Sequence, residues 1–91
     1  MSAPSSCWYV YILRCADGSL YTGVTTDTDR RIKEHNLSDR LGARYTRARR
    51  PVSLAYREPC ENRSVACKRE AQIKALPRSA KLKLLQSAVG Q

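Results

Sequence analysis

Five side chains in this sequence are of types that can act on a phosphate ester or another anionic group. Arg31 and His35 lie four residues apart in a stretch of helical character, so their side chains share one face. A guanidinium is permanently charged and can fork two anionic oxygens, whereas an imidazole can accept or donate a proton near neutral pH. Glu70 offers a hard oxygen ligand of the kind that Mg²⁺ binds. Tyr11 and Tyr21 offer phenol hydroxyls.

Each of these side chains also has a structural interpretation. Most strand tyrosines only pack in the fold, and a lone histidine is more often an ordinary, partly exposed residue. Glu70 precedes Lys74 by four residues, which is the spacing of a surface ion pair on a helix. The residue types alone therefore do not separate a catalytic site from an ordinary small domain.

Charge is the most unusual property of the composition. The 91 residues include 17 Lys and Arg against 8 Asp and Glu, a formal net charge of +9. An excess of this size on a small surface favours a polyanionic partner such as nucleic acid. Charge does not distinguish a protein that cuts nucleic acid from one that only binds it.

The sequence lacks the patterns typical of a zinc site, a signal peptide or a membrane span. The four cysteines are spaced too widely for a CxxC pair, and only His35 could join them. No charged start followed by an apolar run precedes Trp8, and no apolar stretch approaches the length that crosses a bilayer. We therefore expect a cytoplasmic protein with reduced thiols and no membrane contact.

The first part of the chain predicts a β-hairpin followed by a helix. Residues 8–13 are aromatic and β-branched, as strands commonly are. An Asp-Gly turn leads into a second strand over residues 20–24. Thr26 or Asp27 can then cap a helix over residues 28–36. This arrangement places the two tyrosines on the hairpin and the arginine and histidine on the helix.

The remainder of the chain predicts a basic loop, a strand and two helices. Residues 37–50 show no period and are rich in arginine, so we expect an exposed loop. Residues 52–56 alternate apolar and small residues in a third strand, which Pro59 should close. A helix is expected over residues 62–76, and Ser79 can cap another after the proline that follows.

Together these elements predict an α+β fold in the order β-β-α-β-α-α. Its three-stranded antiparallel sheet should be flanked by three helices. We expect residues 1–7 to form a flexible N-terminus and residues 8–88 to form a single domain. Tyr11 and Tyr21, on neighbouring strands of one hairpin, can then face the same side of the sheet.

Two tripeptides on the hairpin resemble the signature of the GIY-YIG nuclease superfamily. They are Tyr9-Val10-Tyr11 and Tyr21-Thr22-Gly23, in which a tyrosine replaces the first glycine, and valine and threonine replace the two isoleucines. Arg31 lies in the place of the family's helical arginine, and His35 follows where the family often has His or Tyr. Glu70 lies in a helix similar to the one that carries the family's metal-binding glutamate.

The resemblance implies metal-dependent hydrolysis of a phosphodiester bond. Glu70 would be the one protein ligand of a Mg²⁺ or Mn²⁺ ion, and Arg31 would hold the phosphate. Tyr11 or Tyr21 would position or deprotonate the attacking water, and the resemblance does not fix which. His35 would accept a proton or hydrogen-bond a tyrosine or the phosphate. Because a free phenol titrates near pKa 10, nearby positive charge would be needed to favour phenolate.

The arginine-rich segment suits contact with a nucleic-acid backbone, because cations alternate there with an aromatic ring. Part of it, Ala43-Arg44-Tyr45-Thr46, together with residues 51–58, is similar to the small single-domain bacterial branch of the superfamily. The residues expected to bind nucleic acid are Arg40, Arg44, Tyr45, Arg47, Arg49, Arg50 and Lys74.

The function that the resemblance implies is that of an endonuclease on branched, flapped or single-stranded DNA, in repair or recombination. DNA is preferred to RNA as the partner, and a monomer is expected. The alternative is a nucleic-acid-binding module with little or no cleavage activity. A third interpretation is a recruitment domain that needs a protein partner for its specificity.

Overall fold

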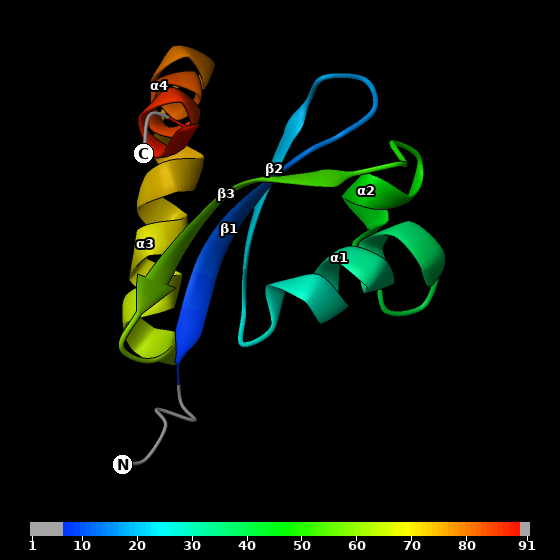
Figure 1. The fold of residues 1–91 in the computed structure, drawn as a ribbon, viewed down its shortest axis with the longest axis horizontal. Coiled ribbons are helices and arrows are strands. Elements are labelled where there is room, and N and C mark those ends of the chain that lie inside the picture. Colours follow the sequence, from blue (N-terminus) through cyan, green and yellow to red (C-terminus); the bar gives the residue numbers. More distant parts are fainter. Residues whose placement is uncertain (1–6, 90–91) are drawn as a thin grey trace.

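The computed structural model describes residues 7–89 and is built on a three-stranded antiparallel sheet in the order β2-β1-β3 (Figure 1). The strands span Trp8–Arg14 (β1), Leu20–Thr25 (β2) and Ser53–Cys60 (β3). The turn between β1 and β2 contains Gly18 at a φ of 86°, which glycine adopts without steric strain. The predicted hairpin is therefore confirmed.

Within residues 7–89 the chain forms three longer helices and a single helical turn. They span Thr28–Leu37 (α1), Arg44–Arg47 (α2), Arg63–Ala75 (α3) and Arg78–Val89 (α4). The carboxylate of Asp27 caps α1 by accepting from the backbone N–H of Arg30, and Asn62 caps α3 in the same way. The α+β class and the order of the longer elements are as predicted.

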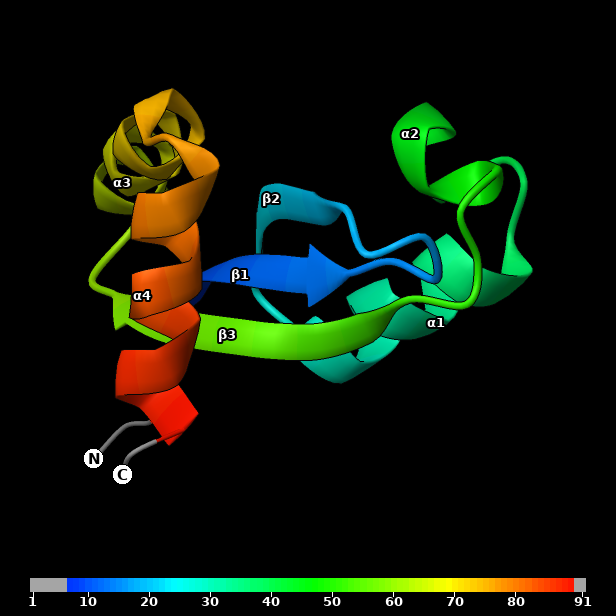
Figure 2. The ribbon, with the colours of Figure 1, turned by 90° about the horizontal axis from the view of Figure 1, so that it is seen from above.

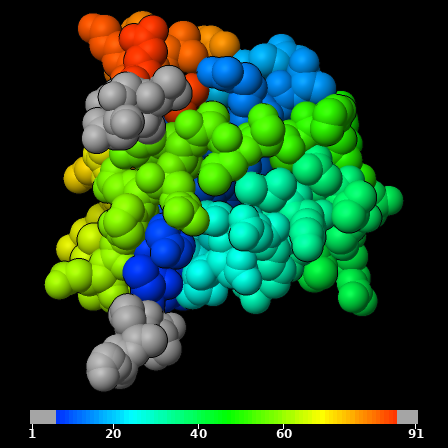
Figure 3. Space-filling view, in the orientation of Figure 1, coloured from blue at the N-terminus to red at the C-terminus, as the bar shows by residue number. Residues whose placement is uncertain are grey.

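Strand β1 is the centre of the fold and is buried on both faces. Its residues alternate: Val10 and Ile12 pack into a cluster with side chains of α3 and α4, whereas Tyr11 and Leu13 pack into another with Ile32 of α1. Helices α3 and α4 accordingly lie on one side of the sheet and α1 and α2 on the other (Figure 1, Figure 2). In the space-filling view, β3 and α1 lie side by side on one face, and of β1 mainly its first part shows between them (Figure 3).

The segment between α1 and β3 differs from the exposed loop that the sequence predicts. Arg44–Arg47 forms the helical turn α2, and Thr46 within it is fully buried. The expectation of a structureless loop over residues 37–50 is therefore wrong in this part. A turn of four residues is too short to show a helical period in a sequence.

Two predicted boundaries also differ. Strand β3 continues through Pro59 to Cys60, because Pro59 pairs with Tyr9 from an edge strand, where a missing N–H is tolerated. Helix α4 begins at Arg78, so Ser79 lies inside it and does not cap it. The expected flexible N-terminus falls, except for Cys7, outside the described residues. Among the helices of residues 7–89, none combines the length and the apolar character needed to cross a membrane.

Candidate active site

Two tyrosines of the hairpin and the histidine of α1 form a cluster of aromatic rings. Tyr11 pairs with Gly23 across the two strands and Tyr21 pairs with Leu13, so both tyrosines lie on the α1 side of the sheet. Their ring centroids are 6.4 Å apart, and His35 lies 6.0 Å from Tyr11 and 5.2 Å from Tyr21. The structure thus brings together three of the side chains singled out in the sequence.

Gly23 makes room for the hydroxyl of Tyr11. A Cβ atom built at Gly23 would lie 2.5 Å from the Tyr11 hydroxyl oxygen and 2.7 Å from the ring carbon that carries it. Both distances are far below van der Waals contact, so a larger residue would displace the tyrosine. The glycine of the second tripeptide is therefore required for the position of the tyrosine in the first.

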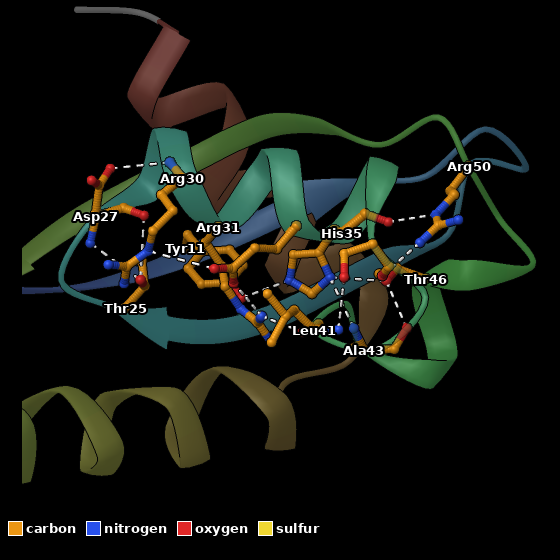
Figure 4. Close-up of polar contacts among 12 residues, drawn as sticks. Tyr11, Thr25, Asp27, Arg30, Arg31, His35, Leu41, Ala43, Thr46 and Arg50 are labelled. Atoms are coloured by element: carbon orange, nitrogen blue, oxygen red, sulfur yellow. Dashed lines mark hydrogen bonds and ion pairs between the residues drawn. The ribbon is translucent and has the colours of Figure 1, made fainter.

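His35 is completely buried and is hydrogen-bonded through both ring nitrogens (Figure 4). Its Nε2 lies 3.0 Å from the Tyr11 hydroxyl, and its Nδ1 lies 2.9 Å from the Thr46 hydroxyl. The backbone N–H of Ala43 also donates to Nδ1, at 3.3 Å. Gly42 allows this approach, since a Cβ there would lie 2.7 Å from the carbonyl oxygen of Glu34. The segment before α2 is thereby held against α1.

Burial moves the pKa values of both bonded residues. Loss of solvation raises the pKa of Tyr11 to about 12, although the neighbouring guanidinium of Arg31 favours the phenolate. Loss of solvation lowers the pKa of His35 to about 4, assisted by the charges of Arg31 and Arg50 and opposed by Glu34. At neutral pH, Tyr11 is therefore protonated and His35 is uncharged.

We expect the stability of the fold to fall as the pH drops from 6.5 to 4. The imidazole has a pKa of 6.5 when free and about 4 in the fold, so the unfolded chain binds the proton more tightly. The contribution of neutral His35 is complete above pH 6.5 and is lost towards pH 4, a change of about 3 kcal/mol at about 1.4 kcal/mol per pKa unit.

Urea unfolding at pH 6.5 and at pH 4 measures this change. His35→Gln is the control, because carboxylates titrate in both proteins and only the imidazole differs. The loss of stability should be markedly smaller in the variant, and an equal loss in both proteins would contradict the assignment.

Arg31 extends from α1 beside Tyr11 (Figure 4). Its Nη1 donates to the carboxylate of Glu34 at 2.7 Å and to the carbonyl oxygen of Leu41 at 2.6 Å. These bonds orient the guanidinium without using the donors on its other nitrogens. The side chain is 24% exposed, so a solvated anion can still reach it.

Glu70 lies on α3, the helix that packs against β1 and β2. Its side chain is 24% exposed, and its carboxylate lies 3.2 Å from the ammonium of Lys74, one turn later on the same helix. It does not bond to the tyrosine cluster, but its negative charge is among the influences that raise the pKa of Tyr11. The influence of Glu70 is the weakest of those that act on the pKa of Tyr11, and it acts through charge and not through a hydrogen bond.

The carboxylate of Glu70 is a hard oxygen donor, the type of ligand that Mg²⁺ and Mn²⁺ bind. Within residues 7–89, no three or more His, Cys, Asp and Glu side chains gather where they could hold a metal ion. Mg²⁺ and Mn²⁺ retain several waters and bind through one or two carboxylates together with substrate phosphate. One partly exposed carboxylate fits that mode of binding.

Some of the predicted nucleic-acid-binding residues are exposed, and the others, Arg49 and Arg50, contact other groups of the protein. The exposed ones are Arg40, Arg44, Tyr45, Arg47 and Lys74. Tyr45 stacks on Tyr21 with ring centroids 5.8 Å apart, and the guanidinium of Arg49 lies 4.0 Å from the centre of the Tyr45 ring. Tyr45 and Arg49 thus extend the aromatic cluster towards the surface.

Arg50 is engaged by the end of α1. Its Nε donates to the carbonyl oxygen of His35 at 2.6 Å, Nη2 to that of Ser38 at 3.0 Å, and Nη1 to the carboxylate of Asp39 at 2.9 Å. All three guanidinium nitrogens of Arg50 therefore bond to the chain at the end of α1. The geometry therefore favours a structural role for Arg50 over a contact with phosphate.

Four contributors to the cluster are not found by the sequence reasoning. Thr46 and the Ala43 N–H hold the imidazole, while Glu34 and the Leu41 carbonyl hold Arg31. Glu34 carries a usable signal, because it follows Arg31 by three residues on a predicted helix. The other contacts depend on how the segment before α2 folds back onto α1, which no local pattern encodes.

Comparison with known proteins gives relatives over most of the chain. This chain is 58% identical over 81 residues to the UPF0213 protein DP2720 of Desulfotalea psychrophila, a match that covers 89% of this chain and 73% of the relative. It is 51% identical over 77 residues to the UPF0213 protein SSP2268 of Staphylococcus saprophyticus, covering 85% of this chain and 92% of the relative.

Solved structures agree with this relationship. The solution structure of EF2693 from E. faecalis has a TM-score of 0.62 and 41% identity, covering 93% of this chain and 88% of that one. The solution structure of the UPF0213 protein BH0048 from Bacillus halodurans has a TM-score of 0.56 and 45% identity, covering 88% of this chain and 83% of that one. Residues 7–83 match the family described as the GIY-YIG catalytic domain. The chain therefore belongs to the GIY-YIG family, which is a family of nucleases.

Proposed function

We propose that this protein is a metal-dependent endonuclease that hydrolyses phosphodiester bonds in DNA. The observation that carries the proposal is the joint position of Tyr11, Tyr21, His35 and Arg31, which lie together at the hairpin and α1 with the charge of Glu70 in reach. A cation, a carboxylate and phenols meet the main needs of phosphodiester hydrolysis, which are charge neutralisation and a positioned water.

Arg31 is the side chain that we assign to the phosphate. Its guanidinium is permanently charged, partly exposed and held in place by Glu34 and Leu41. A group oriented before the substrate arrives does not have to reorganise as negative charge gathers on the phosphoryl oxygens. Arg31 therefore stabilises the transition state and keeps the scissile group in line.

The two tyrosines have different environments, which supports different roles. Tyr11 is 2% exposed, bonded to His35 and protonated at neutral pH, so it can donate a hydrogen bond but does not act as a base. Tyr21 is only partly buried and lies at the solvent side of the same rings. We assign to Tyr21 the positioning of the attacking water and, as a phenolate favoured by nearby positive charge, the acceptance of the water's proton.

Glu70 is the residue that would hold the divalent ion, with Mg²⁺ and Mn²⁺ as the candidates. When bound, such an ion supplies positive charge to the phosphate and to the departing oxygen. Lys74, which pairs with Glu70 in this structure, would be released from the carboxylate and could approach the nucleic-acid backbone.

The exposed cations at α2 and on α3 support a polyanionic substrate. Arg44, Arg47 and Lys74 lie on the surface, and the net charge of +9 attracts a phosphate backbone. Tyr45 stacks on Tyr21 and carries the guanidinium of Arg49 over its ring, so the pair presents an aromatic and cationic edge to an unpaired base. We therefore propose branched, flapped or single-stranded DNA as the substrate, in repair or recombination.

Cleavage of a panel of end-labelled DNA and RNA structures, with Mg²⁺ or Mn²⁺ added, tests the proposal. Products should form from the DNA structures that contain unpaired strands, and should vanish when the metal is chelated. Binding that weakens with salt, without products under any metal, would favour the alternative of a nucleic-acid-binding module.

We expect Tyr21→Phe to slow cleavage much more than Tyr11→Phe. Loss of a group that transfers a proton costs about a hundredfold or more, whereas loss of one neutral hydrogen bond costs about tenfold. Single-turnover rates on the best substrate measure both effects. Tyr56→Phe is the matched control, because its hydroxyl bonds Glu58 on β3 at 2.6 Å. A larger loss in Tyr11→Phe would reverse the two assigned roles.

A further inference from the structure

The hydrogen bonds around His35 allow two arrangements of its single ring proton, and they give Tyr11 opposite roles. If Nδ1 carries the proton, it donates to Thr46, and Nε2 accepts the hydrogen of the Tyr11 hydroxyl. If Nε2 carries the proton, it donates to the Tyr11 oxygen, and Nδ1 accepts from its own neighbours. Only the second arrangement leaves the Tyr11 hydrogen available for another group.

The backbone N–H of Ala43 decides between the two arrangements. It points at Nδ1 at 3.3 Å, and a backbone N–H can only donate. A proton on Nδ1 would face this N–H directly and leave it without an acceptor in a part-buried position. The Thr46 hydroxyl can adapt to either case, since a hydroxyl both donates and accepts.

The Thr46 hydroxyl has two acceptors for its hydrogen, the Ala43 carbonyl oxygen at 2.9 Å, to which it can donate, and Nδ1 of His35 at 2.9 Å. That carbonyl already accepts from the backbone N–H groups of Thr46 and Arg47 at 3.1 Å and 3.2 Å. Its needs are therefore met without the hydroxyl. Thr46 is fully buried, so its hydroxyl does not contact bulk water in this position.

We propose that Thr46 and the Ala43 N–H are positioning groups that fix His35 in the tautomer protonated on Nε2, so that the imidazole donates to Tyr11. The oxygen of Tyr11 then accepts from His35, and the tyrosine directs its own hydrogen to an anionic oxygen at the site. The significance for cleavage rests on the proposed function, but the tautomer itself is a property of the free protein.

This arrangement also connects the surface segment to the buried ring. Helix α2 carries Arg44, Tyr45 and Arg47 on the surface and Thr46 in the interior. The three residues that would contact the nucleic acid and the one that bonds to the imidazole are therefore consecutive in the chain. The segment before β3 is therefore part of the site and not only a binding loop.

Nitrogen-15 NMR of the imidazole tests the proposal without any cleavage. The chain contains one histidine, so every ring signal belongs to His35. Near neutral pH, Nε2 should show the shift of a protonated nitrogen and Nδ1 that of an acceptor. Protonation on Nδ1, or rapid averaging of the two nitrogens, would overturn the proposal whether or not the protein cuts DNA.

Variants at Thr46 separate positioning from simple packing. Thr46→Val keeps the shape and loses the hydroxyl. The proton should stay on Nε2, because the Ala43 N–H still opposes a proton on Nδ1, but the nitrogen-15 shift of Nδ1 should move towards that of a more weakly bonded acceptor. Thr46→Ser should restore the Nδ1 shift of the unaltered protein. Thr28→Val is the control, since it removes another buried hydroxyl, bonded to Arg57 at 3.2 Å and remote from the ring. An unchanged Nδ1 shift in Thr46→Val would show that the Thr46 hydroxyl does not donate to the ring, and a proton moved to Nδ1 would show that the Ala43 N–H does not fix the tautomer.

Discussion

Replacing Arg31 by alanine should lower the rate of DNA cleavage about a hundred- to a thousandfold. That is the usual cost of removing one preorganised charge from a developing negative transition state. The loss should appear in the single-turnover rate, while the affinity for DNA changes much less, because many other cations contribute to binding. Rates at saturating protein and binding by fluorescence anisotropy measure the two effects separately.

Arg30→Ala is the matched control for this experiment. Arg30 is the preceding residue on α1, pairs with the same Glu34 at 3.6 Å, and has a side chain that is 59% exposed. Both variants remove one positive charge from the same helix. Equal rate losses in the two variants would show that net charge, and not the position of Arg31, controls cleavage.

Replacing Glu70 by glutamine should reduce metal-dependent cleavage by at least about a thousandfold. A metal ion supplies several kcal/mol of charge stabilisation, and the neutral amide is a far weaker ligand than the carboxylate. DNA binding should be retained or strengthened, because a negative charge has been removed next to Lys74. Product formation as a function of Mn²⁺ concentration, together with a binding curve, measures both.

Glu61→Gln provides the comparison for Glu70. Glu61 is an exposed residue that precedes the cap of α3, so its replacement changes the charge without touching the proposed ligand. Cleavage by Glu61→Gln should equal that of the unaltered protein. Full activity in Glu70→Gln would mean that another group holds the metal ion.

The parts of the fold that could be predicted are those with strong local signals. The hairpin has aromatic strands around an Asp-Gly turn, and α1 and α3 have side-chain caps at Asp27 and Asn62. The spacing of Arg31 and His35 on one helix likewise places both towards the sheet. For these elements, local chemistry and tertiary packing agree.

The parts that could not be predicted depend on tertiary contacts. The burial of Thr46 follows from the close approach of Gly42 to α1, and the length of β3 follows from its pairing with β1. Neither the burial of Thr46 nor the length of β3 produces a hydrophobic period or a helix cap that can be recognised in the sequence. The interaction of Glu70 with Lys74 was expected from spacing, and its presence is compatible with a metal ligand as well as a surface pair.

The central claim is that Glu70 and the cluster of Tyr11, Tyr21, His35 and Arg31 form one site. Paramagnetic broadening by Mn²⁺, mapped over the backbone amides and the His35 ring, tests this directly because it falls steeply with distance from the ion. The strongest broadening is expected around Glu70 and the two tyrosines, and it should disappear in Glu70→Gln. Broadening centred elsewhere, or unchanged in that variant, would contradict it.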